Sequence, residues 1–251
     1  MADVENPVVL MLHGFLGSPQ NWRVCAEAMS ARHRVLVPEL PIFSGLHLAD
    51  RQEHVLRFLL ELIETKQTRR VVVMGNSLGG QLALHLARRT PERVIGLVLT
   101  GSGGLYKPKP MRIFYRRPGR EWLRGYIREI FYAETMVTEA MVDELEDIFN
   151  DRQRLREVVR LAKNIRKVSV RELLPQMHCP VLIVWGAEDR ITPPSAAREF
   201  QKLLPDAELH FIPQCGHTPM LERPDEFTRL AEDFLRRVAA RPTAQDLMSR
   251  T

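Results

Sequence analysis

Apolar residues in the first hundred positions follow two alternating patterns. Short continuous apolar runs predict strands buried on both faces of a parallel sheet, and longer segments with apolar residues at helical spacing predict amphipathic helices. The predicted strands span residues 7–12, 34–38, 71–74 and 94–100, and the predicted helices span residues 20–31, 49–66 and 81–89. This alternation is typical of a doubly wound α/β fold, in which helices cover both faces of a parallel sheet.

The alternation stops after residue 104. Between residues 105 and 175 the sequence has helical patterns and no strand pattern, which indicates an inserted helical segment. The predicted helices span residues 120–132, 138–149 and 152–167. Thr138 and Asp151 stand where the N-caps of the second and third of these helices are expected. An insertion of this kind is a candidate lid over the carboxyl ends of the strands.

Strand and helix patterns resume near residue 180. They predict strands at 180–186 and 207–212 and helices that end near residues 204 and 238. Residues 207–212 alternate as an edge strand would. We therefore predict an α/β core made of residues 1–104 and 176–251, with a sheet of about six mostly parallel strands, and a lid made of residues 105–175.

The composition suits one globular domain that carries an insertion. The chain has 251 residues, of which 45% are hydrophobic and 27% charged. No apolar run approaches the roughly 20 residues needed to cross a bilayer, and the amino terminus lacks a signal-peptide pattern. Cys25, Cys179 and Cys215 have no metal-ligand spacing, so we expect free thiols in a reducing compartment, with the cytoplasm as the default location.

The net charge of +5 comes with no nucleic-acid-binding motif. A solvated arginine-rich surface is the favoured interpretation, so we expect neither a nucleic acid nor a membrane as partner, and leave monomer or dimer open. The predicted lid has a basic stretch that Glu121 alone opposes: Lys107, Lys109, Arg112, Arg116, Arg117, Arg120, Arg124 and Arg128. A solvated helix face is favoured over attraction of an anionic substrate.

A serine stands at the turn between the third predicted strand and the next helix. Gly75, Ser77 and Gly79 form a Gly-x-Ser-x-Gly sequence directly after the buried run 71–74. Small residues two positions before and after the serine permit the strained turn that exposes a nucleophilic hydroxyl. The next helix points its first N–H groups and positive dipole end at any anion that forms there. Ser77 is therefore a candidate nucleophile, although the motif alone also fits an ordinary glycine-rich loop.

A serine nucleophile needs a histidine base, and the histidine needs an orienting acid. In this kind of fold the chain order is serine, acid, histidine. Glu188 and Asp189 follow the fifth predicted strand, and His217 follows the sixth. Because the carboxyl ends of parallel strands share one sheet edge, these groups should meet Ser77 there. The loop 101–104 contains no carboxylate, and both acidic residues stay open as the acid.

The loop after the first predicted strand contains His13, Gly14 and Phe15. An oxyanion hole needs two backbone N–H groups, for which we predict those of Leu78 and Phe15. Asn76, His13 and Gly14 are candidates for contact with the substrate, and for His13 a hydrogen bond within its loop is favoured over a role as base. The sequence has no metal-binding motif, and we expect neither a metal nor a cofactor.

Four segments together resemble the motifs of the α/β-hydrolase superfamily, and the similarity covers nearly the whole chain outside the predicted lid. They are residues 13–15, 75–80, 185–193 and 215–217. The resemblance implies that Asp189 rather than Glu188 is the acid. Members of the superfamily usually begin with an antiparallel hairpin, but only six residues precede Pro7, so we expect a shortened, all-parallel sheet.

Two groups within the superfamily compete. Asn76, residues 132–139 and the pair Asp189 and Arg190 resemble the carbon–carbon bond hydrolases of meta-cleavage pathways. Those enzymes tend to have a tryptophan after the catalytic histidine, where this chain has Thr218. Residues 13–18 look more like general esterases and the vitamin-K-pathway lyase of this fold.

The sequence favours a serine carboxylesterase that cleaves small or medium acyl esters through Ser77, His217 and Asp189 and an acyl-enzyme. The first alternative is a carbon–carbon bond hydrolase for an anionic vinylogous diketone, whose carboxylate the lid arginines would bind. The second alternative, from another class, is a non-catalytic protein of the same fold that binds a small molecule.

Overall fold

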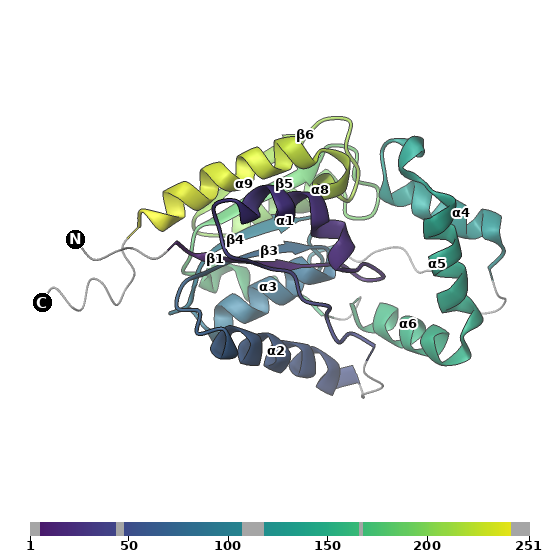
Figure 1. Ribbon diagram of the computed structural model, residues 1–251, viewed down its shortest axis with the longest axis horizontal. Coiled ribbons are helices and arrows are strands. Elements are labelled where there is room, and N and C mark those ends of the chain that lie inside the picture. The colour runs from purple at the N-terminus through teal and green to yellow at the C-terminus, as the bar shows by residue number, and fades with distance from the viewer. Residues whose placement is uncertain (1–5, 44–47, 107–117, 166–167, 242–251) are drawn as a thin grey trace, which may run out of the picture.

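A sheet of six parallel strands forms the centre of the computed structural model, which describes residues 6–43, 48–106, 118–165 and 168–241 (Figure 1). The strands are β1 (Val8–Leu12), β2 (Val35–Leu36), β3 (Val71–Asn76), β4 (Val94–Thr100), β5 (Val181–Gly186) and β6 (Ala207–Ile212). Their order is β2-β1-β3-β4-β5-β6, and every neighbouring pair is parallel. The predicted fold class and the edge position of the last strand are confirmed.

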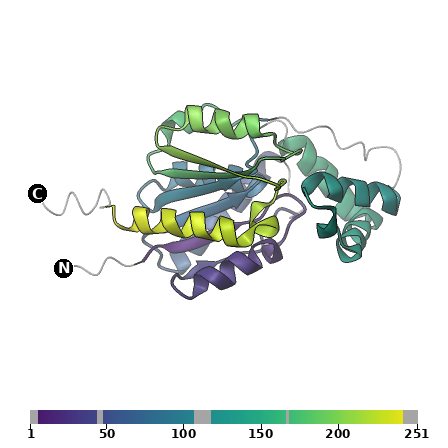
Figure 2. The ribbon, with the colours of Figure 1, turned by 90° about the horizontal axis from the view of Figure 1, so that it is seen from above.

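Helices cover both faces of this sheet (Figure 2). On one face lie α2 (Leu48–Thr65), α3 (Leu78–Arg89) and α7 (Pro194–Leu203), and on the other lie α1 (Arg23–Ser30), α8 (Pro219–Glu222) and α9 (Pro224–Ala239). Successive strand residues point to opposite faces, so Leu10 and Leu12 join the first core while Val9 and Met11 join the second. Burial on both faces explains why the strands read as continuous apolar runs.

The predicted boundaries differ from the observed ones mainly where elements are short. Residues 20–31 divide into a 3-10 helix, η1 (Pro19–Trp22), and α1. The four-residue helix α8 was not predicted, and neither were two further 3-10 helices, η2 (Glu134–Met136) and η3 (Leu174–Gln176). One turn of helix carries too little periodicity to be seen in a sequence. None of the helices in the described part is long and apolar enough to cross a membrane.

In the described part of the chain, three α-helices stand between β4 and β5 in the sequence: α4 (Arg120–Ile130), α5 (Glu139–Asn150) and α6 (Arg152–Ile165). They lie beyond the carboxyl ends of the strands (Figure 1). Both predicted N-caps are confirmed, since Thr138 Oγ1 accepts from Met141 N and Asp151 Oδ1 accepts from Gln153 N. The helices share an apolar cluster of their own: Leu123, Ile127, Phe131, Val142, Leu145, Phe149 and Val158.

The basic side chains of α4 pair with acidic side chains of α5 and of α4 itself. The ion pairs join Arg120 to Glu139, Asp143 and Glu146, Arg124 to Glu121 and Glu139, and Arg128 to Glu121. Surface pairs of this kind contribute only about 0–1 kcal/mol each to stability. They do occupy the three arginines on the outside of the helices, which agrees with the predicted solvated face. Lys107, Lys109, Arg112, Arg116 and Arg117 lie outside the described residues.

The turn from β3 into α3 is packed backbone against backbone. A Cβ built on Gly79 would lie less than 3.0 Å from the carbonyl oxygen of Leu12 on β1. A Cβ built on Gly75 would also lie less than 3.0 Å from the carbonyl oxygen of Gly79. Side chains cannot be accommodated without moving strands, so both motif glycines are required by this close approach rather than by a positive φ.

We predict opposite effects for two Gly→Ala substitutions in helices. Gly79→Ala should lower the free energy of unfolding by about 3 kcal/mol or more, because backbone atoms of β1 occupy the space of the new Cβ. Gly125→Ala in α4 should raise it by about 0.5–1 kcal/mol, because nothing lies within 4 Å of that Cβ and alanine favours the helix. Urea denaturation of both variants measures this, and equal stabilities would contradict the close packing.

Candidate active site

Ser77 stands at the apex of the β3–α3 turn in a strained backbone conformation. Its φ of 54° and ψ of −112° lie in a region that non-glycine residues rarely adopt, at a cost of about 1–3 kcal/mol. Its N–H donates to Thr100 O (3.0 Å), and its carbonyl oxygen accepts from Gly103 N (3.0 Å). The Ser77 hydroxyl makes no hydrogen bond to any residue that the structure describes, so it is available for other chemistry.

His217 and Asp189 are joined by a short hydrogen bond. Nδ1 of His217 lies 2.9 Å from Oδ2 of Asp189, and both side chains are buried. The His217 ring also packs on the loop after β4, where a Cβ built on Gly101 would lie 2.7 Å from Nδ1. A carboxylate oxygen can only accept a hydrogen bond. Nδ1 of His217 is therefore the donor to Asp189 and carries the ring proton. Nε2 is then the ring nitrogen with a free lone pair, as a general base requires.

The Asp189 carboxylate is held by its own loop. Oδ1 accepts from the N–H groups of Ile191 (2.8 Å) and Thr192 (2.9 Å), and Oδ2 accepts from Thr192 Oγ1 (2.8 Å) as well as from His217. Thr192 is in turn positioned by Trp185, whose Nε1 donates to Thr192 O (2.8 Å). Sequence reasoning did not identify Thr192; the only local signal is Asp189 itself, since an aspartate commonly accepts from the backbone two residues further on.

The neighbouring carboxylate, Glu188, binds a backbone N–H group instead of the His217 ring. Its Oε2 accepts from the N–H of Cys215 (3.0 Å), so it links the loops after β5 and β6. Burial raises the pKa of the Cys215 thiol, and nearby Glu222 raises it further, so this cysteine is a poor nucleophile beside His217. The described geometry thus separates the two acidic candidates, with Asp189 on the imidazole and Glu188 on the backbone.

Asn76 connects the serine turn with the histidine loop. Its Nδ2 donates to Thr100 O (3.2 Å) and to His217 O (3.0 Å), and the side chain is buried. Both donors of the amide are therefore engaged by backbone carbonyl groups. The structure shows a framework role for Asn76, and contact between Asn76 and a substrate stays a prediction.

The loop after β1 lies directly beside Ser77. A Cβ built on Gly14 would be 3.1 Å from Ser77 Cβ. His13 is fully buried, with Nδ1 donating to Gly14 O (3.0 Å) and Nε2 accepting from Leu40 N (3.1 Å). Burial lowers the pKa of His13, which agrees with the neutral ring that these two bonds require. The hydrogen bonds fit the structural role favoured for His13; substrate contact at His13 or Gly14 stays a prediction.

Two backbone N–H groups beside Ser77 have no acceptor among the described residues. They belong to Leu78, the first residue of α3, and to Phe15, which lies in the loop after β1. Helix N-termini leave such donors unpaired by geometry, and the helix dipole favours negative charge at the same place. A negatively charged oxygen next to Ser77 would be stabilised by both features, although the role of these two groups as an oxyanion hole is itself a prediction.

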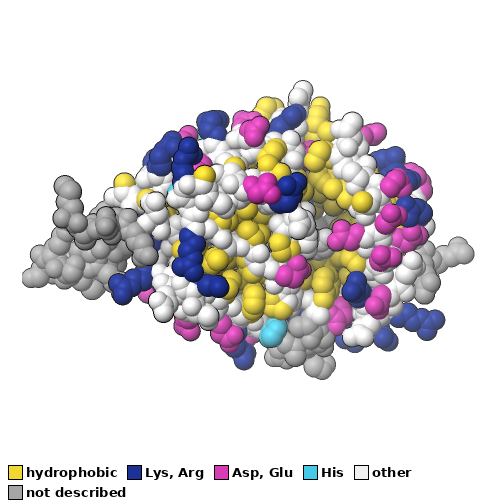
Figure 3. Space-filling model, viewed as in Figure 1, with side chains coloured by type: hydrophobic (Ala, Val, Ile, Leu, Met, Phe, Trp, Pro, Cys, Tyr) yellow, Lys and Arg dark blue, Asp and Glu magenta, His cyan; other side chains and the backbone are white. Residues whose placement is uncertain are grey.

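Apolar side chains lie between this edge of the sheet and the helices α4–α6. Phe15, Leu16 and Leu221 pack against the apolar cluster of α4–α6. Hydrophobic side chains also gather along the middle of the face shown in Figure 3, between the core and these helices. In the part of the chain that is described, no group of three or more His, Cys, Asp or Glu residues could hold a metal ion.

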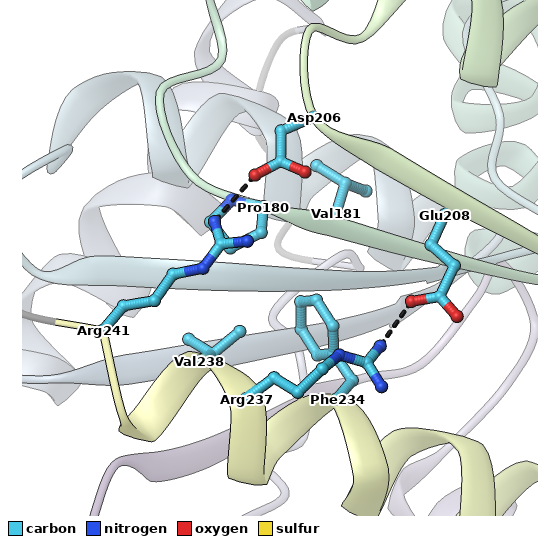
Figure 4. Close-up of a pocket in the computed structure, with 8 residues that line it drawn as sticks. All are labelled: Pro180, Val181, Asp206, Glu208, Phe234, Arg237, Val238 and Arg241. Atoms are coloured by element: carbon cyan, nitrogen blue, oxygen red, sulfur yellow. Dashed lines mark hydrogen bonds and ion pairs between the residues drawn. The ribbon is translucent and has the colours of Figure 1, made fainter.

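A small cavity of about 50 Å³ lies at the opposite end of the strands (Figure 4). It is bounded by the first residues of β5 and β6 and by the end of α9. Arg241 pairs with Asp206 (2.7 Å) and Arg237 pairs with Glu208 across it. The cavity is separate from Ser77, His217 and Asp189, which follow the carboxyl ends of their strands.

Comparison with known proteins identifies the class that this fold and site define. The model of the alpha/beta hydrolase family matches residues 9–230, and the chain belongs to that family. It is 32% identical to a 2-hydroxy-6-oxo-6-phenylhexa-2,4-dienoate hydrolase from Comamonas testosteroni, over 92% of this chain and 88% of that protein. It is 29% identical to a 2-hydroxy-6-oxononadienedioate/2-hydroxy-6-oxononatrienedioate hydrolase from Burkholderia vietnamiensis, over the same shares.

Comparison with solved structures gives the same result as the comparison of sequences. An alpha/beta hydrolase from a sediment metagenome of the Mar Chica lagoon has 31% identity and a TM-score of 0.72, covering 93% of this chain and 92% of its own. A 2-hydroxy-6-oxo-6-phenylhexa-2,4-dienoate hydrolase from Rhodococcus sp. strain RHA1 superposes with a TM-score of 0.81 at 24% identity, covering 93% and 92% of the two chains. The first match supports the family, and the second supports the fold.

We predict the effect of weakening the hydrogen bond between His217 and Asp189. Asp189→Asn should slow covalent labelling of Ser77 by a fluorophosphonate by about 1,000-fold to 10,000-fold, because an amide favours the wrong tautomer of the ring. Glu188→Gln is the matched control, since its carboxylate contacts the N–H of Cys215 instead. We expect it to stay within about tenfold of the unaltered chain. The reverse ranking would make Glu188 the acid.

Proposed function

We propose that this member of the alpha/beta hydrolase family is a serine hydrolase. His217 removes the proton of the Ser77 hydroxyl, and Oγ forms a bond to a substrate carbonyl carbon. Asp189 orients the ring and stabilises its charged form. The observation that carries the proposal is the 2.9 Å bond between His217 and Asp189 at the same sheet edge as the strained, unbonded Ser77.

The oxyanion of the tetrahedral intermediate would be held by the N–H groups of Leu78 and Phe15. His217 then gives its proton to the leaving group as the bond from the carbonyl carbon to that group breaks. Water adds to the acyl-enzyme by the same route, with His217 as base, and releases the acid and the Ser77 hydroxyl. Losing one oxyanion donor typically costs on the order of 100-fold to 1,000-fold in rate.

The names of the similar proteins support carbon–carbon bond hydrolysis as the first candidate among the substrate classes. A 2-hydroxy-6-oxo-6-phenylhexa-2,4-dienoate has a ketone and a carboxylate and no ester, so its hydrolysis must break a bond between carbon atoms. The matches to these two dienoate hydrolases, at 32% and 29% identity, extend over almost the whole chain, including the inserted helices. This support changes the order expected from the sequence, where ester hydrolysis stood first.

Ester hydrolysis is the second candidate, and one observation favours it. A dienoate substrate needs a cation for its carboxylate, but Arg120, Arg124 and Arg128 are already paired with acidic side chains of α4 and α5. Phe15 and Leu16 pack against the apolar cluster of α4–α6, and the charged residues buried between α6 and the core, Glu157 and Arg51, are paired with one another. A surface of that kind suits an uncharged acyl group.

We further propose that residues 105–175 act as a lid on a core made of residues 1–104 and 176–251. The apolar cluster of α4–α6 meets the core at Phe15, Leu16 and Leu221, which border the loops beside Ser77 and His217. A cover at this place would exclude water and select the substrate.

Replacement of the proposed nucleophile tests the function. Ser77→Ala should reduce turnover at least about 1,000-fold for whichever substrate the chain accepts, a meta-cleavage dienoate or a short p-nitrophenyl ester. Ser102→Ala is the control, because this buried serine donates to Gly103 O and faces Gly80. Equal turnover by Ser77→Ala and the unaltered chain would refute the serine mechanism.

The same assay separates the substrate classes. Dienoate cleavage with little ester cleavage supports carbon–carbon bond hydrolysis, and the opposite ratio supports the esterase. Saturable binding of a ligand without turnover, combined with no labelling of Ser77 by a fluorophosphonate, would favour a non-catalytic binding protein.

A further inference from the structure

A single carboxylate bridges the inserted helices and the loop that carries His217. Glu222 is the last residue of α8. Its Oε1 accepts from the N–H of Gly216 (2.8 Å), and its Oε2 accepts from the N–H of Tyr132 (2.7 Å), just beyond α4. Burial raises the pKa of Glu222, and the backbone N–H donors oppose that rise. The segments of Tyr132 and Gly216, far apart in the sequence, are therefore tied to one side chain.

The two segments also touch directly. The N–H of His217 donates to the carbonyl oxygen of Ile130 (2.7 Å), the last residue of α4. The contact is close, because a Cβ built on Gly216 would lie 2.5 Å from Ile130 O and 2.8 Å from Tyr132 N. The carbonyl group of His217 is held from the other side by Asn76 Nδ2 (3.0 Å). The backbone of His217 is thus clamped between the serine turn and the end of α4.

We infer that Glu222 is a positioning residue for His217, which holds the end of α4 against the 216–217 loop and so sets where Nε2 of the ring stands relative to Ser77. This inference rests on the proposed serine mechanism and adds to it a link between the inserted helices and the base. A displacement of about 1 Å in a base can cost on the order of 100-fold in rate. The link makes the placement of α4 and the activation of Ser77 depend on one another.

A neutral side chain of the same shape cannot replace Glu222. Both of its oxygens act as acceptors from N–H groups. Glutamine has one acceptor oxygen, so whichever way its amide turns, an NH₂ group faces the N–H of Gly216 or Tyr132. One donor then loses its partner, which is unfavourable where the groups are withdrawn from water, and the two segments are no longer held together.

The experiment compares Glu222→Gln with Glu226→Gln, a glutamate of α9 whose carboxylate forms no ion pair with the described residues. The rate of fluorophosphonate labelling at Ser77, located by peptide mass, is measured with the thermal unfolding midpoint of each variant. We expect Glu222→Gln to label about 10–100-fold more slowly than the unaltered chain at a temperature well below its midpoint, and Glu226→Gln to label normally. With an accepted substrate, kcat should fall while KM changes less than about threefold.

Each outcome decides the inference. A lowered unfolding midpoint with an unchanged labelling rate would mean that Glu222 only stabilises the fold, and would overturn it. If Glu222→Gln does not fold, Glu222→Asp is used, because it keeps the charge but is one methylene too short to reach both N–H groups. Slow labelling of this variant supports the inference, and normal labelling overturns it. Failure of the unaltered chain to label at Ser77 would instead refute the serine mechanism.

Discussion

Backbone contact between the β3–α3 turn and β1 is the constraint on which the site depends. Gly79 lies so close to the carbonyl oxygen of Leu12 that no side chain fits between them. This contact, with the bond from Ser77 N to Thr100 O, holds the turn on two neighbouring strands at once. A strained φ costs about 1–3 kcal/mol and persists only where the surroundings determine it in this way. The position of Ser77 is thus a property of the sheet.

The proposed base, His217, is held by different interactions. His217 comes from the loop after the edge strand β6, and hydrogen bonds locate it: Asp189 at the ring, Asn76 and Ile130 at the backbone. A hydrogen bond contributes only about 0.5–1.5 kcal/mol net, far less than a packed core. The two halves of the site are therefore held in different ways, and the His217 half is the one that the inserted helices contact through a backbone hydrogen bond.

The sequence predicted what local pattern or chain order encodes. Buried runs gave the strands, the spacing of Gly75, Ser77 and Gly79 gave the turn, and order along the chain pointed to the loops of Asp189 and His217. A contact between a side chain and a backbone group far away in the sequence leaves no such pattern. For this reason the sequence did not predict the hydrogen bond from Tyr132 N to the Glu222 carboxylate. The basic stretch of α4 seemed opposed by Glu121 alone because its other acidic partners, on α5, are brought to it only by folding.

The choice between the two substrate classes does not depend on the proposed triad. Ser77 and His217 would deliver the same two things to either substrate: an oxygen nucleophile at a carbonyl carbon, and later a proton to the departing atom. An ester releases an oxygen that accepts this proton readily, whereas a ketone releases a carbon, which departs only if conjugation delocalises its electron pair.

A carbon–carbon bond hydrolase must therefore bind its substrate so that the conjugated system and its carboxylate are held in register with Ser77. That demand falls on the surface between the core and the inserted helices, where Phe15 and Leu16 pack against the apolar cluster of α4–α6 and where Arg51 of α2 pairs with the buried Glu157 of α6 (3.8 Å). If this surface selects the substrate, described arginines that already have carboxylate partners, on α4 and at Arg51, would favour bonds that need no anion recognition, even in a chain whose relatives are named as dienoate hydrolases.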